Sequence, residues 1–476
     1  MLFNSFTFLL FFLSVLSVHS LPLPWSIRKF DLLVASYMFY AAWDVRFTLL
    51  LVFATATNYL AGVMIARWDE SPRRRRTVLW LDVVLNIGLL CAFKYGNEFL
   101  DAGEWLSHHF VPSHESPSLR ILLPVGLSFF TFQSLSYTID VYRRTIKPAK
   151  SLLDLSLFVA FFPVLLSGPL LRAANFLPQC AQPRRATGDQ LGLGAALITL
   201  GLFMKITLAD QLLSPIVQQV FNPNVYPGML SSWIGTVAFA GQDYCDFAGY
   251  TTCAMGIGLC LGFTLPENFR APFASIGFRD LWQRWHITLV AWMRDYVFFS
   301  LGGIYKGYVR AAINVLIVFL LIGLWHGATM QYVVFGLLHG SYLIIETMLQ
   351  RSPVRRMELW NGVFGKLLAW VATMLLCCIA FVFYRSETLG QSWQILLAMS
   401  GAADRSFPFQ LAEYDILVGG LIIESLIIVH WLRRNLSLQE VAVRAPWWAT
   451  AVCLSAMLMA MVVTNGAPQA FLYFNY

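Results

Sequence analysis

The sequence NVLIVFLLIGLW, at residues 314–325, runs directly into His326 and Gly327. Asn314 is the one polar residue in these twelve positions. A stretch of this composition is typical of a helix buried in a large protein core or in a membrane. The composition of the whole chain favours the membrane, because 58% of the residues are hydrophobic and 12% are charged. That charged fraction is about half of the ~25% found in soluble domains.

Comparable apolar stretches recur along all 476 residues. A spanning helix needs about 20 apolar residues, so ten or eleven spans would occupy roughly 200–220 positions. We therefore predict an all-α polytopic membrane protein with about 10–12 transmembrane helices. Shorter stretches that carry Pro or Arg fit re-entrant or interfacial helices better. This composition excludes a soluble enzyme, a disordered chain and a secreted domain built on disulfides.

The net charge of +7 is spread over short basic clusters between the apolar stretches, such as Arg73 to Arg76. Such clusters are typical of cytoplasmic loops and of contact with anionic lipid headgroups. They predict membrane lipids as partners and no nucleic acid. No linker divides the chain, so we predict a single domain over residues 1–476, with a polar, histidine-bearing core at 243–340.

The region from Leu265 to Arg310 is too polar for contact with lipid and too apolar for a free loop. Asp280 and Arg284 are neighbours on one face of a helix, in the favourable order. Asp295 follows eleven residues later, about three turns along nearly the same face. The spacing predicts a polar seam that faces the interior and marks the position of a site.

His326 is the strongest candidate for chemistry, because an ionisable side chain within a membrane is functional by default. Burial favours the uncharged ring, which is the form that a general base needs. The alternative is a hydrogen-bonded packing residue. His339 lies thirteen residues further on, roughly 220° around a continuous helix, and we expect a structural role for it.

Other catalytic patterns are missing from the sequence, including a GxSxG elbow, a P-loop and an HExxH zinc motif. We therefore expect neither a metal nor a bound cofactor. Taken alone, these features predict a membrane enzyme or a transporter with a histidine-bearing polar cavity.

Two segments narrow this prediction: DLWQRWHITLVAWMRDYVFFSLGG (280–303) and LWHGATMQYVVFGLLHG (324–340). They resemble the paired histidine blocks of the membrane-bound O-acyltransferases. The likeness is greatest to the bacterial branch that serves alginate O-acetylation and teichoic-acid D-alanylation. Further blocks agree in the same order along the chain: PVGLSFFTFQSLSYTIDVYRR (124–144), FFPVLLSGPLLR (161–172), DYCDFAGYTTCAMGIGLCLGFTLPENF (243–269) and FLYFNY (471–476).

The resemblance implies a bundle of about eleven spans with re-entrant helices around a central tunnel. It assigns His326 as the general base that takes a proton from an acceptor hydroxyl, and His286 as the second histidine of the site. Further residues expected to line the tunnel or orient groups are Trp285, Arg284, Asp295, Trp325 and Asn268.

The resemblance also implies an O-acyltransferase of the bacterial cytoplasmic (inner) membrane that moves acetyl from acetyl-CoA towards an exported polysaccharide. A separate extracytoplasmic acetyltransferase is the expected partner. The alternatives are D-alanyl transfer from a carrier protein, and a transporter or scaffold without catalysis. Thr252, Ser300 and the pair Ile304-Tyr305 depart from the pattern of the family, which affects details of the acceptor or partner rather than the reaction class.

Overall fold

The computed structural model describes residues 1–110, 120–352, 362–402, 408–464 and 466. Within these ranges every named secondary-structure element is a helix. A single isolated β-bridge pairs Pro227 with Phe409. The predicted all-α polytopic class is confirmed. The block at 471–476, which contributed to the family resemblance, lies outside the described residues.

The contacts within the chain define two compact units, Met1–Thr187 with Cys260–Thr264, and Gly188–Leu259 with Leu265–Tyr476. The single domain expected from the sequence stays a prediction. The helices of the first unit are α1 (Phe6–Ser20), α2 (Trp25–Ala41), η1 (Val45–Phe47), α3 (Thr48–Arg67), α4 (Pro72–Phe110), α5 (Leu127–Tyr142), α6 (Leu152–Ala160), α7 (Phe162–Leu165) and α8 (Ala173–Cys180).

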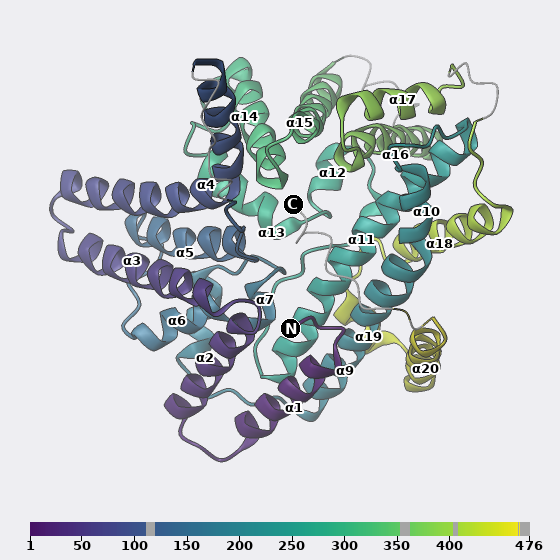
Figure 1. Cartoon of the computed structure of the whole chain (residues 1–476). Coiled ribbons are helices and arrows are strands. Elements are labelled where there is room, and N and C mark those ends of the chain that lie inside the picture. Colours follow the sequence, from purple (N-terminus) through teal and green to yellow (C-terminus); the bar gives the residue numbers. More distant parts are fainter. Residues whose placement is uncertain (111–119, 353–361, 403–407, 465, 467–476) are drawn as a thin grey trace. The chain divides into compact units, whose positions relative to one another are not determined.

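In this first unit, α3, α4 and α5 pack side by side (Figure 1). Gly62 of α3 makes the contact with α5 possible, because a Cβ atom at this position would overlap the ring of Tyr137. Close approach at a small residue is the usual way in which membrane helices associate.

The second unit carries both candidate histidines. Its helices are α9 (Gly188–Phe203), η2 (Met204–Leu213), α10 (Ser214–Val220), α11 (Met229–Cys260, whose last residue belongs to the first unit), η3 (Pro272–Ala274), α12 (Phe278–Trp282), α13 (Ile287–Trp292), η4 (Met293–Phe298), α14 (Tyr308–His326), α15 (Met330–Arg351), α16 (Val363–Arg385), α17 (Leu389–Met399), α18 (Glu413–Leu432), α19 (Leu438–Arg444) and α20 (Trp447–Val463). Both η2 and η4 are π-helices.

Seven helical segments among the described residues are long and apolar enough to cross a membrane. They comprise Val45–Arg67, Pro72–Trp105, Gly188–Val220, Tyr308–His326, Met330–Arg351, Val363–Arg385 and Glu413–Leu432. Two shorter apolar helices, α1 and α20, have 15 and 17 residues. The chain is thus a multi-pass membrane protein, while the expected count of 10–12 spans and the central tunnel stay predictions.

The predicted continuous seam from Arg284 to Asp295 is wrong, because the chain is not one helix there. α12 ends at Trp282, and His286 has a left-handed backbone (φ 44°) immediately before α13 begins at Ile287. This break turns the chain, so the face that Asp280 and Arg284 share does not continue to Asp295. Two short helices, α12 and the largely apolar α13, lie where the spacing suggested a single long element.

Candidate active site

His326 is the last residue of α14, the helix formed by the apolar stretch 314–325. The helix ends there because Gly327 adopts an extended conformation, and a Cβ atom on Gly327 would collide with the ring of Tyr332. The backbones of α14 and α15 approach closely at Gly323 and Gly336, where an added Cβ atom would overlap a carbonyl oxygen of the opposite helix. The two glycines therefore fix where the end of α14 lies against α15.

The His326 side chain is buried, with 7% of its surface exposed. Its Nδ1 atom lies 3.1 Å from the hydroxyl oxygen of Tyr384 on α16. If Nδ1 carries the proton and donates it to this oxygen, the lone pair is on Nε2. The Tyr384 ring also packs edge-on against the His326 ring at 4.9 Å between centroids. Tyr384 thus holds the histidine by both hydrogen bonding and packing.

His286 is held by Asn268, which precedes it in the loop after α11. The Asn268 Oδ1 atom accepts hydrogen bonds from the Thr288 backbone N–H (3.2 Å) and the Thr288 hydroxyl (2.8 Å). A backbone N–H can only donate, so this atom is the oxygen of the amide. His286 Nδ1 lies 3.1 Å from the same oxygen and therefore donates to it, which places the ring's lone pair on Nε2.

Burial lowers the pKa of His286 to about 3, so its ring is neutral throughout the physiological range. Its left-handed backbone is uncommon for a residue with a Cβ atom, and such conformations persist where the surroundings impose them. Here the Ile287 N–H donates to the Asn268 carbonyl and the Arg270 N–H donates to the Arg284 carbonyl, both at 2.9 Å. These bonds stabilise the turn that presents His286.

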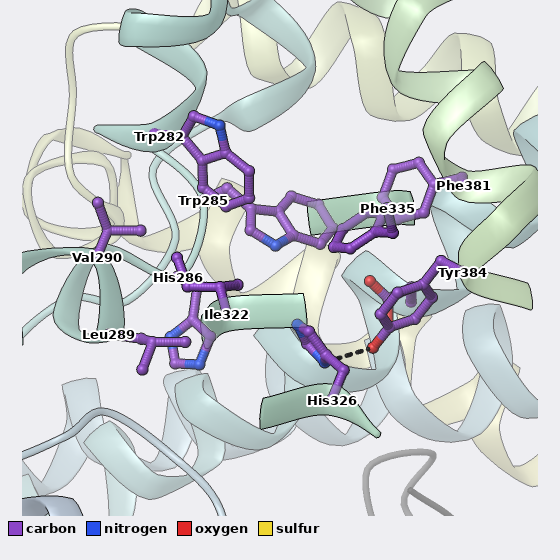
Figure 2. A pocket seen from close by; sticks show the side chains of 11 residues that line it. Trp282, Trp285, His286, Leu289, Val290, Ile322, His326, Phe335, Phe381 and Tyr384 are labelled. Atoms are coloured by element: carbon purple, nitrogen blue, oxygen red, sulfur yellow. Dashed lines mark hydrogen bonds between the residues drawn. The ribbon is translucent and has the colours of Figure 1, made fainter. Parts of the chain in front are cut away.

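The two histidines line one cavity of the second unit, drawn in Figure 2. Asp243 comes from α11 and Ile322 from α14, and the remaining lining is mainly aromatic. The full lining is Asp243, Trp282, Trp285, His286, Leu289, Val290, Ile322, His326, Phe335, Phe381 and Tyr384. The volume of this cavity is about 20 Å³, which is enough for a water molecule or two.

Two larger cavities adjoin the histidine cavity and share side chains with it. One, of about 210 Å³, is bordered by the shared rings of Trp282, Trp285, Phe335 and Phe381 and is lined almost entirely by carbon. The other is a groove of about 1130 Å³, which shares Trp282, Val290 and Ile322 with the lining of the histidine cavity. Exposed arginines from three elements line this groove: Arg279, Arg294 and Arg351.

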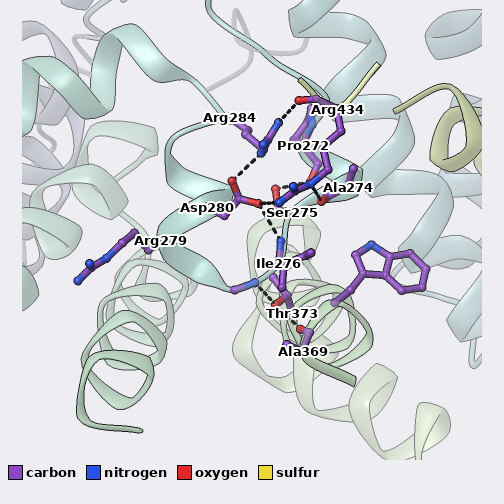
Figure 3. Close-up of polar contacts among 12 residues, drawn as sticks. Pro272, Ala274, Ser275, Ile276, Arg279, Asp280, Arg284, Ala369, Thr373 and Arg434 are labelled. Carbon is purple, nitrogen blue, oxygen red and sulfur yellow. Dashed lines mark hydrogen bonds and ion pairs between the residues drawn. The ribbon is translucent and has the colours of Figure 1, made fainter. Parts of the chain in front are cut away.

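Arg284 lies outside the histidine cavity, in an ion-pair network with Asp280 and Arg434 (Figure 3). The Asp280 carboxylate accepts from Arg284 Nε at 2.7 Å, from Arg434 Nη2 at 2.6 Å and from the Ile276 N–H at 2.9 Å. Arg284 also donates to the Arg434 carbonyl at 2.6 Å. The pairing of Asp280 with Arg284 expected from their spacing is confirmed, and its position indicates a role in holding the loop 270–284 against the end of α18.

Of the residues predicted for the site, Trp285, His286 and His326 line the cavity. Asn268 holds His286 through its hydrogen bond with Nδ1, and the Trp325 ring lies 5.7 Å from the His286 ring and 4.9 Å from the His326 ring. Asp295 pairs with Arg294 at 2.7 Å, beside the groove. His339 is packed among aromatic rings and lines the apolar cavity instead.

The sequence reasoning missed Asp243 and Tyr384. Asp243 carried a usable signal, since a carboxyl group within an apolar helix marks a functional position. Tyr384 carried none, because it lies 58 residues from its partner His326 on another helix. Among the described residues there is no group of three or more His, Cys, Asp or Glu that could hold a metal ion.

Comparison with known proteins gives one consistent result. Residues 141–385 match the sequence profile of MBOAT, the membrane-bound O-acyltransferase family. The chain is 35% identical to the "Probable alginate O-acetylase AlgI" of Pseudomonas aeruginosa, over 94% of this chain and 84% of the relative. It is 28% identical to the peptidoglycan O-acetyltransferase of Helicobacter pylori, over 94% and 91%. It is also 28% identical to the teichoic acid D-alanyltransferase of Bacillus subtilis, over 60% and 73%.

Proposed function

Because the chain belongs to the membrane-bound O-acyltransferase family and is an acyltransferase, we propose that it transfers acetyl groups from acetyl-CoA for the O-acetylation of an exported polysaccharide. The observation that carries this proposal is the histidine cavity, in which His326, at the end of an apolar span, and His286 are both buried. The similarity to alginate and peptidoglycan O-acetylating proteins supports acetyl as the group and a cell-envelope polymer as the destination.

His326 acts as the general base in this proposal. Its Nε2 atom takes the proton of the acceptor hydroxyl while the hydroxyl oxygen attacks the thioester carbonyl carbon. The C–S bond then breaks, and the CoA thiolate takes the proton from the imidazolium. The products are an acetyl ester and the CoA thiol, so the protein returns to its starting protonation state. Neutral His286 and Trp285 line the place where these groups meet, and no metal or bound cofactor takes part.

The arginine-lined groove supports acetyl-CoA as the donor. Guanidinium groups are suited to bind phosphate oxygens, and CoA carries its phosphates at the end remote from the thioester. The groove adjoins the histidine cavity, so a donor bound there through its phosphates extends towards His326. Arg351 ends α15 and forms a basic cluster in the sequence with Arg355 and Arg356, which lie outside the described residues. Such a cluster is typical of a cytoplasmic position.

We place the protein in the bacterial inner membrane, with the acceptor side facing outwards. A separate extracytoplasmic acetyltransferase would receive the acetyl group and modify the polysaccharide, and the surrounding lipids would contact the basic loops. The similarity to a teichoic acid D-alanyltransferase favours a second candidate, D-alanyl transfer from a carrier protein. A neighbouring gene for a D-alanine ligase and carrier would favour this second function.

Inverted membrane vesicles given acetyl-CoA labelled in the acetyl group test the proposal. We expect label to appear in ester linkage with wild-type protein and to be lost with His326→Gln. The matched control is His19→Gln, the same change at a buried histidine of the first unit whose Nε2 lies 3.2 Å from the Leu261 carbonyl. Equal labelling by His326→Gln and His19→Gln would overturn the role of His326. Labelling from D-alanyl carrier but not from acetyl-CoA would overturn the acetyl donor.

A further inference from the structure

Asp243 is a carboxyl group in the histidine cavity that the proposed mechanism does not yet use. It projects from α11 into the lining shared by His286 and His326 and is 4% exposed. Its Oδ1 atom has no hydrogen-bond partner within the described part of the chain. A buried polar atom without a partner destabilises a fold by about 1–3 kcal/mol, so its presence beside two candidate catalytic groups calls for a functional reason.

The same helix carries a second buried acid, Asp246, whose carboxyl group has an ion-pair partner. Asp246 lies one helical turn further along α11 and is ion-paired with Lys205 of η2. Lys205 also pairs with Asp210 at 2.9 Å. The single ammonium group is thus already matched by two carboxylates, and it does not serve as a counter-ion for Asp243.

These surroundings favour the neutral acid form of Asp243. An ionised carboxylate away from water is costly unless a cation or several donors compensate it, and the negative charge of Asp246 on the same helix face adds repulsion. A protonated carboxyl group is a hydrogen-bond donor. Asp243 therefore brings an O–H group to the cavity.

The hydrogen bonds of both histidines show that Asp243 does not orient either ring through Nδ1. An aspartate in a catalytic triad orients its histidine through Nδ1. In this cavity Nδ1 of His326 is bonded to Tyr384, and Nδ1 of His286 is bonded to Asn268. Orientation of the two rings through Nδ1 is already provided, so Asp243 is not needed for it, and its O–H group is available to a substrate atom.

We propose that Asp243 is a catalytic residue that donates a hydrogen bond from its neutral carboxyl group to the carbonyl oxygen of the acyl thioester. The inference rests on the proposed acyl transfer. As the acceptor oxygen bonds to the carbonyl carbon, the carbonyl electron pair moves to its oxygen, and the Asp243 O–H group stabilises the negative charge there. When the C–S bond breaks the carbonyl re-forms, and Asp243 keeps its proton throughout.

Two substitutions of similar shape separate this role from a structural one. Asp243→Asn keeps a hydrogen-bond donor, whereas Asp243→Leu keeps the branched shape without any donor. Loss of one oxyanion donor lowers kcat by about 10²–10³-fold. We expect Asp243→Leu to lower the rate of acetyl-ester formation in vesicles by that factor and Asp243→Asn to remain within about tenfold of wild type.

Thermal unfolding of the purified proteins provides the independent readout. Replacing a partnerless buried acid by an apolar side chain of the same shape is neutral or stabilising. Asp243→Leu is therefore expected to unfold at the same or a higher temperature than wild type while losing activity. Asp82→Asn, the same amide change at a buried acid of the first unit that accepts from Asn86 at 3.0 Å, is the control and is expected to leave the rate unchanged.

Three results would overturn the role of Asp243. Equal loss of rate in Asp243→Asn and Asp243→Leu would indicate that the carboxylate charge, not a donor, is required. Rates within threefold of wild type for both variants would remove Asp243 from catalysis. A lower unfolding temperature for Asp243→Leu would indicate a structural role. If wild-type vesicles do not transfer acetyl, this result overturns the proposed function instead. It is distinct from the three results above, which compare the variants with active wild-type vesicles.

Discussion

The histidine cavity and the Asp280 network (Asp280, Arg284 and Arg434) are two polar clusters of the same unit with opposite character. In the network, every buried side-chain nitrogen and oxygen of these three residues has a partner within the described chain. In the cavity, Asp243 Oδ1 and Trp282 Nε1 have none there. Satisfied polar networks rigidify a structure, whereas partnerless polar groups destabilise it. The difference supports the proposal that the network holds the site and that the cavity provides the reacting groups.

The largest effect on activity is expected from a substitution of His326 in the histidine cavity. General base catalysis contributes about 10²–10⁴ to a rate, so His326→Gln is expected to lower acetyl-ester formation by roughly 10³-fold. Because Gln fills a similar space, the unfolding temperature should stay close to that of wild type. Quantification of ester-linked acetate per folded protein tests both statements, and a rate within tenfold of wild type would count against His326 as the base.

The opposite outcome is expected for Asp280→Ala. This change leaves Arg284 and Arg434 without their shared carboxylate, and loss of one partner from a buried ion pair costs about 3–5 kcal/mol. Because the Asp280 side chain is 22% exposed, solvent screening reduces this to roughly 2–4 kcal/mol. Denaturation in detergent measures the loss, and activity per folded molecule should change less than threefold. A stable but inactive variant would place the network in the chemistry.

Tyr384→Phe tests the contribution of the Tyr384 hydroxyl to the histidine cavity. It removes the hydroxyl that lies 3.1 Å from His326 Nδ1 but keeps the ring that packs against His326. We expect kcat to fall about tenfold, as for loss of other groups that orient a reactive side chain, with KM for acetyl-CoA unchanged. Steady-state kinetics in nanodiscs separates the two parameters. A rise in KM with constant kcat would indicate that Tyr384 binds the donor instead.

The smallest expected effect concerns acid stability. Burial lowers the pKa of His286 from 6.5 to about 3, so between these values the unfolded chain binds a proton that the folded protein does not. Stability therefore falls as pH drops below about 6.5, by up to roughly 1.4 kcal/mol per pH unit. His286→Gln should reduce this loss between pH 6.5 and 5. Identical pH dependence of unfolding in both proteins would contradict the burial of a neutral His286.

The fold class and the candidate His326 were predictable from sequence because they depend on local patterns, whereas His286 was assigned to the site by the family resemblance. A stretch such as 314–325 has to be an apolar helix, and a histidine at its end stands out. The position of Arg284 in a supporting network was not predictable, because it depends on Arg434, 150 residues further along the chain. The left-handed turn at His286 also escaped prediction, since it is imposed by Asn268 and not by the residues beside it.

The most direct test measures His326→Gln and Asp280→Ala side by side, for ester-linked acetate on secreted polysaccharide and for unfolding temperature at matched membrane levels. The account predicts that His326→Gln loses acetate and keeps its stability, while Asp280→Ala loses stability and keeps acetate per folded molecule. Full acetate with His326→Gln, or acetate lost in a fully stable Asp280→Ala protein, would contradict the division of the unit into a reactive cavity and a supporting network.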